Sequence, residues 1–260
     1  MPFKTFGLSD PLVQGILATG FTAPTEIQSR AIPAVMKGRD MIACAQTGTG
    51  KTAAFVLPML DRLSHSKSPH RKAVRSLILT PTRELAVQIE EAIHTYGRFL
   101  KVDTLAIYGG VNINGQLHTL RRGVDIIVAT PGRLMDHMQR GSVDLRQVEV
   151  LVLDEADRML DMGFIHDVRK IVAALPHKRQ TLLFSATISQ EVKTLAANLL
   201  QSPEMIQVGQ KNNPIETITQ YVYAVEKPAK MDLLLHLLKE KQMYSVLIFS
   251  RTKHGADKIS

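Results

Sequence analysis

The fold of this chain is constrained most by one stretch, Ala45-Gln46-Thr47-Gly48-Thr49-Gly50-Lys51-Thr52. It follows the apolar run Met41–Cys44 and precedes an amphipathic segment, so the pattern predicts a strand, a glycine-rich turn and the start of a helix. Glycines let successive backbone N–H groups point inward, Lys51 can reach outer phosphates and the Thr52 hydroxyl can ligate magnesium. The stretch therefore predicts a phosphate-binding loop, although the general pattern has glycine where this chain has Ala45. The alternative is a glycine-rich surface turn with a solvated lysine.

Short apolar runs alternate with helix-period segments after this loop. The predicted strands are Ser76–Thr80, Thr104–Tyr108, Asp125–Thr130, Val148–Asp154, Thr181–Ser185 and Met205–Val208. The predicted helices are Arg83–Phe99, Asn114–Arg122, Arg133–Arg140, Phe164–Leu175 and Gln190–Leu200. Consecutive Val, Ile and Leu residues indicate strands that are covered on both faces. We therefore predict an α/β fold, a mostly parallel sheet with helices on both faces and ligands at the carboxyl ends of its strands.

Composition limits the classes of partner. The 260 residues carry 32 Lys and Arg against 24 Asp and Glu, which favours polyanions but is equally consistent with a solubility device. Cys44 is the only cysteine, so the sequence has no disulfide framework, and a cytoplasmic location is expected. No signal-peptide pattern and no apolar run of about 20 residues occurs, so we expect no membrane role.

Two further motifs follow predicted strands. Asp154-Glu155-Ala156-Asp157 comes directly after the run 150–153, where a buried carboxylate needs a cation or hydrogen bonds. This favours a magnesium ligand and a base that orients water; the alternative is a solvated strand end with Asp154 as a helix cap. Ser185-Ala186-Thr187 ends the next strand, and its hydroxyls are predicted either to bond the acidic cluster or to cap the following helix.

Three loops each combine a small or turn-forming residue with a hydroxyl group, an arginine or a predicted helix N-terminus. They are Pro81-Thr82-Arg83-Glu84-Leu85-Ala86, Gly109-Gly110 and Thr130-Pro131-Gly132-Arg133. Such groups can grip a sugar-phosphate backbone without reading bases, although each loop alone is ordinary. Aromatic residues make up only 5% of the chain and tryptophan is absent, so base stacking on an aromatic platform is not expected.

The composition changes near Gly209–Pro214, which predicts a domain boundary. We predict a first domain over residues 1–208, a linker over 209–216 and an incomplete second domain over 217–260. Within that last part the pattern predicts strands at Ile218–Val225 and Val246–Phe249 and helices at Met231–Lys239 and Arg251–Ile259. So few residues are not expected to bury a core of their own.

Taken in order, these motifs resemble those of the DEAD-box RNA helicases, and most closely the bacterial RhlE type. The series runs through Gln28, Ala45–Thr52, Pro81–Leu85, Gly109-Gly110, Thr130–Arg133, Asp154–Asp157 and Ser185–Thr187. Alanine at position 45 is usual in that family, whereas Glu26 replaces a commoner proline. The resemblance implies two RecA-like domains, of which the second is truncated here.

The resemblance also implies roles for individual residues. Phe3 would pack on adenine and Gln28 would read its edge. The loop Ala45–Thr52 would hold ATP, Thr52 and Asp154 would hold Mg²⁺, and Glu155 would orient the attacking water. Ser185 and Thr187 would couple hydrolysis to RNA release. RNA would lie along the positions Pro81, Thr82, Arg83, Gly109, Gly110, Thr130, Pro131, Gly132 and Arg133.

The function implied is an RNA-dependent ATPase that locally separates short duplexes, with single-stranded or short duplex RNA held mainly by its backbone. Because the second domain of the family supplies arginine fingers, the alternative is an ATP-regulated RNA-binding module without significant turnover. An unrelated phosphate-loop ATPase that acts on DNA or protein is a third reading. A monomer is expected.

Overall fold

The computed structural model describes residues 2–65, 73–209, 219, 221–240 and 243–260. The chain forms two compact units, Met1–Gly209 and Gln210–Ser260. The predicted linker, 209–216, lies outside the described residues except for Gly209. None of the helices in the described ranges has the length and apolar character needed to cross a bilayer.

The first unit is built on a seven-stranded sheet whose order is β3-β4-β2-β5-β6-β1-β7. Its strands are β1 Met41–Cys44, β2 Ser76–Leu79, β3 Thr104–Ile107, β4 Ile126–Ala129, β5 Val150–Leu153, β6 Gln180–Ser185 and β7 Glu204–Gln207. Every neighbouring pair is parallel. The predicted parallel α/β fold is therefore confirmed, and the predicted strands differ from the observed ones by a residue or two at their ends.

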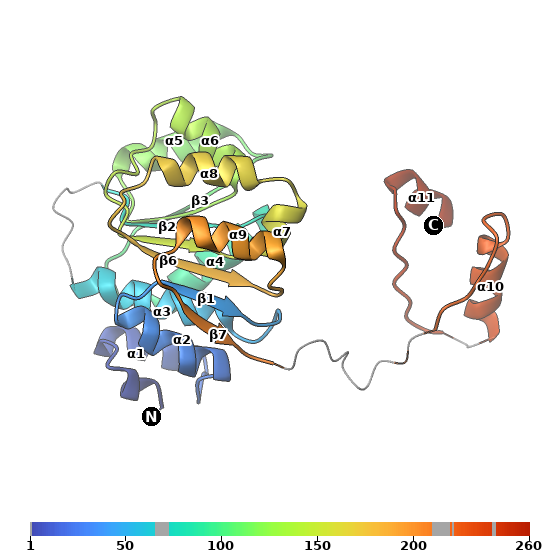
Figure 1. The fold of residues 1–260 in the computed structure, drawn as a ribbon, viewed down its shortest axis with the longest axis horizontal. Helices are drawn as coiled ribbons and strands as arrows, with labels where there is room; N and C mark the ends of the chain where they lie inside the picture. The colour runs from blue at the N-terminus through green and yellow to red at the C-terminus, as the bar shows by residue number, and fades with distance from the viewer. Residues whose placement is uncertain (1, 66–72, 210–218, 220, 241–242) are drawn as a thin grey trace. The chain divides into compact units, whose positions relative to one another are not determined.

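Helices cover both faces of this sheet (Figure 1). They are α1 Asp10–Leu17, α2 Glu26–Met36, α3 Lys51–His65, α4 Arg83–Tyr96, α5 Ile113–Arg122, α6 Pro131–Gln139, α7 Ala156–Asp161, α8 Ile165–Ala173 and α9 Gln190–Leu199, after a short 3₁₀ turn at Pro2–Phe6. Helices α1 to α4 share one core with alternate strand residues such as Ala43, and α6 to α9 share the other with residues such as Ile42. Both side-chain directions of a strand are thus buried, which explains the uninterrupted apolar runs.

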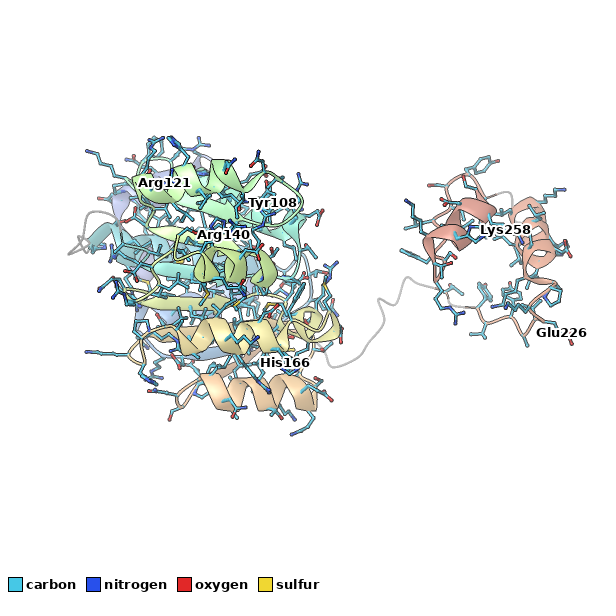
Figure 2. The ribbon with its side chains drawn as sticks, turned by 90° about the horizontal axis from the view of Figure 1, so that it is seen from above. Tyr108, Arg121, Arg140, His166, Glu226 and Lys258 are labelled. Atoms are coloured by element: carbon cyan, nitrogen blue, oxygen red, sulfur yellow. The ribbon has the colours of Figure 1, made fainter. Side chains whose placement is uncertain are left out.

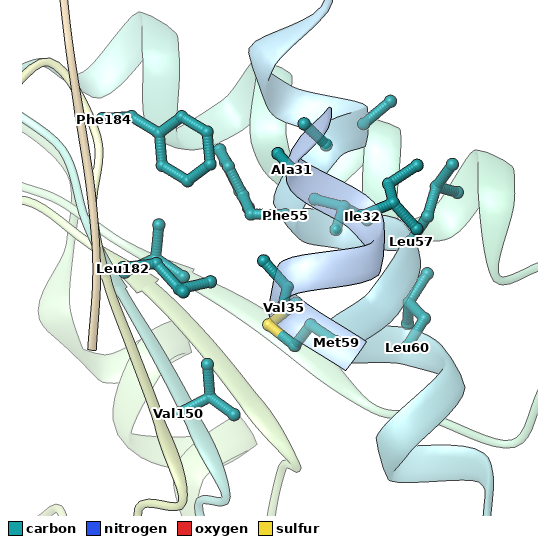
Figure 3. Close-up of a cluster of buried hydrophobic side chains, with 14 of the residues drawn as sticks. Ala31, Ile32, Val35, Phe55, Leu57, Met59, Leu60, Val150, Leu182 and Phe184 are labelled. Carbon is teal, nitrogen blue, oxygen red and sulfur yellow. The ribbon is translucent and has the colours of Figure 1, made fainter. Parts of the chain in front are cut away.

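The core that α1 to α4 share, beneath the glycine-rich loop, contains several buried aromatic rings. Phe55 of α3 meets Phe184 of β6, their ring centroids 5.1 Å apart, and Ile32 and Val35 of α2 lie beside them (Figure 3). Helix α3 is continuous through Pro58. This packing anchors the helix that begins at the glycine-rich loop against the strand that ends at Ser185.

The N-terminal segment is attached to the same core by specific contacts. The Ser9 backbone N–H donates to the buried Asp61 carboxylate of α3 at 2.7 Å. Gly15 of α1 lies against the Tyr96 carbonyl at the end of α4, so close that a Cβ atom would collide with it. These contacts fix α1 and the turn that precedes it on α3 and α4.

The second unit departs from the prediction. Its described residues form helices α10 Lys230–Glu240 and α11 Lys253–Ile259, close to the two predicted helices. The predicted strand Val246–Phe249 is wrong, since its residues have no strand structure and Phe249 is exposed. Positions 218 and 220 of the predicted strand Ile218–Val225 lie outside the described residues, and its described positions, 219 and 221–225, have no strand structure. A strand needs hydrogen-bonded neighbours and a face to bury, and the described part of this unit contains no buried side chain.

Candidate functional site

All the predicted motifs after strands gather at the carboxyl edge of the one parallel sheet. The strand order divides them into two groups. The glycine-rich loop follows β1, the acidic turn follows β5 and Ser185 ends β6, and these three strands are adjacent in the sheet. The three loops with glycine, threonine and arginine follow β2, β3 and β4. Strands β2 and β5 pair directly, so the two groups meet at that boundary.

The glycine-rich loop has the conformation that its sequence requires. Gly48 and Gly50 have φ of 80° and 93°, a region that favours glycine. Lys51 opens α3 and is buried, and its Nζ donates to the Ala45 carbonyl at 2.8 Å. Thr49 Oγ1 donates to the Gln46 carbonyl at 2.8 Å, while Gln46 to Gly48 are exposed. The result is an open loop at a helix N-terminus with one buried ammonium, which suits a polyphosphate.

Gln28 joins the start of α2 to this loop. Its Oε1 accepts from the Thr25 backbone N–H at 3.0 Å, and Thr25 caps the helix in return. Its Nε2 donates to the Gly50 carbonyl at 3.1 Å. A Cβ atom on Gly50 would meet this amide, so the glycine also permits the contact. The predicted adenine-reading residue therefore lies directly against the phosphate loop.

Phe3 occupies a different environment from the one that its predicted role suggests. Its ring is only 2% exposed, with Phe6 at 6.1 Å and Phe21 at 6.4 Å between ring centroids. In this conformation Phe3 is a core residue, and its contact with adenine stays a prediction.

Asp154 is buried at the end of β5 and is not a helix cap, because Glu155 takes the cap position of α7. Its Oδ1 accepts from the Glu155 backbone N–H at 3.1 Å. Burial raises the pKa of Asp154 to about 6; Lys51 opposes the rise and Glu155 adds to it. A carboxylate in such a position is stabilised by a cation.

Glu155 and Asp157, the other acidic residues of this turn, contact neighbouring side chains. Glu155 has φ 51° and ψ 52°, a left-handed conformation that costs a non-glycine residue about 1 kcal/mol or more. Its Oε2 lies 3.1 Å from Arg158 Nη1. Asp157 Oδ2 accepts from both the backbone N–H and the hydroxyl of Thr187 at 2.9 Å. Thr187 therefore bonds the acidic cluster, as one of the two sequence alternatives predicted.

Ser185 does not bond the acidic cluster. Its hydroxyl donates to the Thr187 carbonyl at 2.7 Å, and its carbonyl accepts from the Ala45 backbone N–H at 3.1 Å. Helix α9 is capped by Ser189, so neither Ser185 nor Thr187 serves as that cap. A continuous path thus links the phosphate loop, Ser185, Thr187 and the acidic turn.

The other half of the edge presents helix starts and open glycines. Thr82 caps α4 by accepting from the Leu85 N–H at 3.4 Å, and Arg83 is exposed with its guanidinium 5.0 Å from the Tyr108 ring centroid. Thr130 occupies the cap position of α6, with Pro131 at its first turn. Gly109, Gly110 and Gly132 are exposed, and beyond the adjoining backbone no atom lies within 4 Å of where their side chains would begin.

Arg133 is placed differently from the other predicted RNA contacts. Its side chain is 14% exposed, and both of its Nη atoms donate to the Val111 carbonyl at 3.2 Å. Nη1 also donates to Gln116 Oε1 at 3.3 Å. In this structure Arg133 bonds the neighbouring loop.

Sequence reasoning did not assign roles to three residues that the structure brings into the site. Asp157 is visible in the sequence as the fourth residue of the acidic turn, but its partner Thr187 is 30 positions away. Tyr108 and Gln116 carry no local signal, because their contacts depend on how β3, α5 and α6 pack.

The sequence pattern of the DEAD/DEAH box helicase family matches residues 25–195. The chain belongs to this family. The match extends from the cap of α2 to the middle of α9, and so includes both halves of the sheet edge.

Relatives extend the likeness to the whole chain. A DEAD-box ATP-dependent RNA helicase CshA of Bacillus cereus is 42% identical over 258 residues, 99% of this chain and 48% of that protein. The DEAD-box ATP-dependent RNA helicase RhpA of Helicobacter pylori is 39% identical over 257 residues, 99% of this chain and 51% of that protein. The chain thus spans about half the length of the curated relatives it matches. The finer assignment to the RhlE type stays a prediction.

A solved structure agrees with the fold. The crystal structure of a hypothetical ATP-dependent RNA helicase from Sulfolobus tokodaii superposes with a TM-score of 0.70 and 38% identity, covering 77% of this chain and 57% of that one. The predicted RecA-like fold is therefore confirmed for the sheet-bearing unit.

Proposed function

We propose that this DEAD-box chain is the ATP-binding part of an RNA-dependent ATPase that locally separates or remodels short RNA duplexes. The observation that carries the proposal is the strand order, which places the glycine-rich loop, the acidic turn and Ser185 on the adjacent strands β1, β5 and β6 and the three glycine, threonine and arginine loops on β2, β3 and β4. We assign polyphosphate to the first half of this edge and the RNA backbone to the second. Because β2 and β5 are paired, a change around the nucleotide can reach the RNA loops through neighbouring strands.

The nucleotide half suits ATP with magnesium. The glycine-rich loop and Lys51 would hold the phosphates. Gln28 bonds this loop and would lie close enough to contact the edge of a bound adenine. Thr52 follows Lys51, and the buried Asp154 carboxylate supplies the negative charge that a divalent cation requires. When bound, Mg²⁺ would neutralise charge on the phosphates. Glu155, beside Asp154, would orient the attacking water.

RNA is proposed to bind through its sugar-phosphate backbone. The exposed backbone at Gly109, Gly110 and Gly132 leaves room for close approach, and the N-termini of α4 and α6 attract phosphates. Arg83 is exposed on the same side. The form of the RNA, single-stranded or short duplex, the monomeric state and a cytoplasmic location remain parts of the proposal.

A second candidate function is an ATP-regulated RNA-binding module with negligible turnover. It is favoured by one observation: residues 219, 221–240 and 243–260, the described part of the second unit, form no strand and bury no side chain. The family's second domain supplies arginine fingers, which are worth about 10³–10⁵ in rate. Full activity is therefore proposed to require a complete second helicase domain.

ATP turnover with and without single-stranded RNA separates the two functions. RNA-stimulated turnover above the Lys51→Ala background supports the enzyme, whereas binding of both ligands with turnover at background supports the module. Lys51→Ala should abolish ATP binding. In a chain with both helicase domains, Glu155→Gln should bind ATP normally and stop hydrolysis, and normal turnover by this variant would contradict the role of Glu155.

A further inference from the structure

Two buried side chains and one half-buried side chain, from two helices, meet behind the three loops that are proposed to bind RNA. Gln116 of α5 is 6% exposed, His137 of α6 is fully buried, and Arg133 of α6 lies beside them. Gln116 Oε1 accepts from Arg133 Nη1 at 3.3 Å and lies 3.0 Å from His137 Nε2. We call Gln116, Arg133 and His137 the amide hub.

The hub holds the glycine loop on both sides. Gln116 Nε2 donates to the Tyr108 carbonyl at 3.1 Å, immediately before Gly109, and Arg133 donates to the Val111 carbonyl, immediately after Gly110. Arg133 is itself the last residue of the loop that begins at Thr130. The two loops are therefore joined by hydrogen bonds of the buried Gln116 and the half-buried Arg133.

The connection continues to the third loop. The Arg83 guanidinium lies over the Tyr108 ring, so the residue whose carbonyl is held by Gln116 also contacts the loop after β2. Figure 2 shows Tyr108 well separated from Arg121, which lies in the last turn of α5. All three loops proposed to bind RNA are thus linked through one residue of α5.

The hydrogen bonds assign the orientation of the Gln116 amide. Because Arg133 and the Tyr108 carbonyl fix the orientation of the Gln116 amide, its oxygen must face His137, and His137 Nε2 must carry the proton. Ser142 Oγ lies 2.8 Å from His137 Nδ1 and donates its hydroxyl proton to the His137 carbonyl at 3.0 Å. Burial, with Arg133 and Arg140 nearby, lowers the pKa of His137 against the opposing effect of Asp136, which agrees with a neutral ring. Both the oxygen and the nitrogen of the Gln116 amide therefore have hydrogen-bond partners.

We propose that Gln116 is a positioning residue for RNA binding: it sets the relative placement of the three loops at Arg83, Gly109-Gly110 and Thr130–Arg133 without contacting RNA itself. The proposal rests on the proposed function, because it assigns Gln116 to the RNA half of that site. Its distinctive consequence is a loss of RNA affinity with no loss of nucleotide affinity, since the hub lies on α5 and α6 and makes none of the phosphate-loop contacts.

The test compares two matched substitutions in the 260-residue chain. Gln116→Met keeps the length of the side chain and removes its hydrogen bonds, whereas Gln139→Met makes the same change at an exposed position of α6. Binding of a labelled single-stranded oligouridylate and of a labelled ATP analogue is measured for each, with the thermal midpoint of unfolding.

Gln116→Met is expected to weaken RNA binding about tenfold, the effect of losing one or two buried hydrogen bonds. Nucleotide affinity should change by less than about twofold, because Gln116 makes no contact with the phosphate loop and distant sites act almost independently. Gln116→Glu retains the acceptor for Arg133 and His137 and should recover part of the RNA affinity. The Gln139→Met variant should match the unchanged chain in both ligands.

Equal RNA affinity of the Gln116→Met variant and the unchanged chain would overturn the positioning role while leaving the proposed function intact. Failure of the unchanged chain to bind RNA would overturn both. If Gln116→Met does not fold, Ser142→Ala decides, because it removes the hydroxyl that contacts His137 Nδ1 and the His137 carbonyl and leaves Gln116 and Arg133 in place. A loss of about threefold supports the hub, and no loss overturns it.

Discussion

Replacing the buried Asp154 with asparagine should stabilise the chain when no nucleotide or metal is bound. The pKa of Asp154 is raised to about 6 in the folded chain from an ordinary value of 3.8, with desolvation as the largest cause. Well below pH 3.8 the carboxyl is protonated in both states and has no effect. Between the two values the unfolded chain has released a proton that the folded chain retains, so folding stability falls as pH rises; above about 6 the loss is complete.

The size of the effect follows from the two pKa values. A difference of 2.2 between them corresponds to about 3 kcal/mol at pH 8 and to roughly 0.5 kcal/mol at pH 4. Asparagine keeps an oxygen for the Glu155 N–H and has no charge to desolvate. We therefore expect Asp154→Asn to gain up to about 3 kcal/mol at pH 8 and only about 0.5 kcal/mol at pH 4.

Urea unfolding in the presence of EDTA, at several pH values, measures this gain. Asp161→Asn, the same substitution at an exposed residue of α7, is the control and should show little change at either pH. The same Asp154 variant should lose the magnesium-dependent part of its nucleotide affinity. If the gain in the free energy of unfolding at pH 8 is no larger than the gain at pH 4, the interpretation of Asp154 as a desolvated carboxylate that needs a cation is refuted.

Two further predictions concern the nucleotide half. Gly50→Ala should weaken nucleotide binding more than Gly48→Ala: both glycines have positive φ, but only the first change collides with Gln28, and titration with an ATP analogue measures the difference. Equal losses would mean that the Gln28 contact is unimportant. Phe3→Ala should lower stability by about 3–5 kcal/mol, as for a buried ring, and should weaken ATP more than inorganic triphosphate. Equal weakening of the two ligands would leave Phe3 a core residue only.

Local pattern was enough to predict most elements of the first unit. Strands buried on both faces leave uninterrupted apolar runs, and helices such as α4 begin at recognisable caps, so their bounds were predicted within a few residues. The same reasoning failed for Val246–Phe249, because an apolar run becomes a strand only where neighbouring strands can pair with it.

Predictions for the site varied in the same way. Gly48 and Gly50 have the positive φ that their loop needs, and Asp154 is buried after its strand, because each depends on a few consecutive residues. The inward-turned Arg133 and the buried Phe3 could not be predicted, because their side chains are placed by elements distant in sequence.

What the sequence alone determined was therefore the set of strand, turn and helix junctions and the chemical groups at each, since backbone conformation at a junction is set by adjacent residues. Only the tertiary structure decided that the junctions after β1, β5 and β6 form one half of an edge and those after β2, β3 and β4 the other. It also decided that Gln116 joins the loops of the second half. Strand order and buried polar contacts depend on packing across the whole sheet, which no local window of sequence contains.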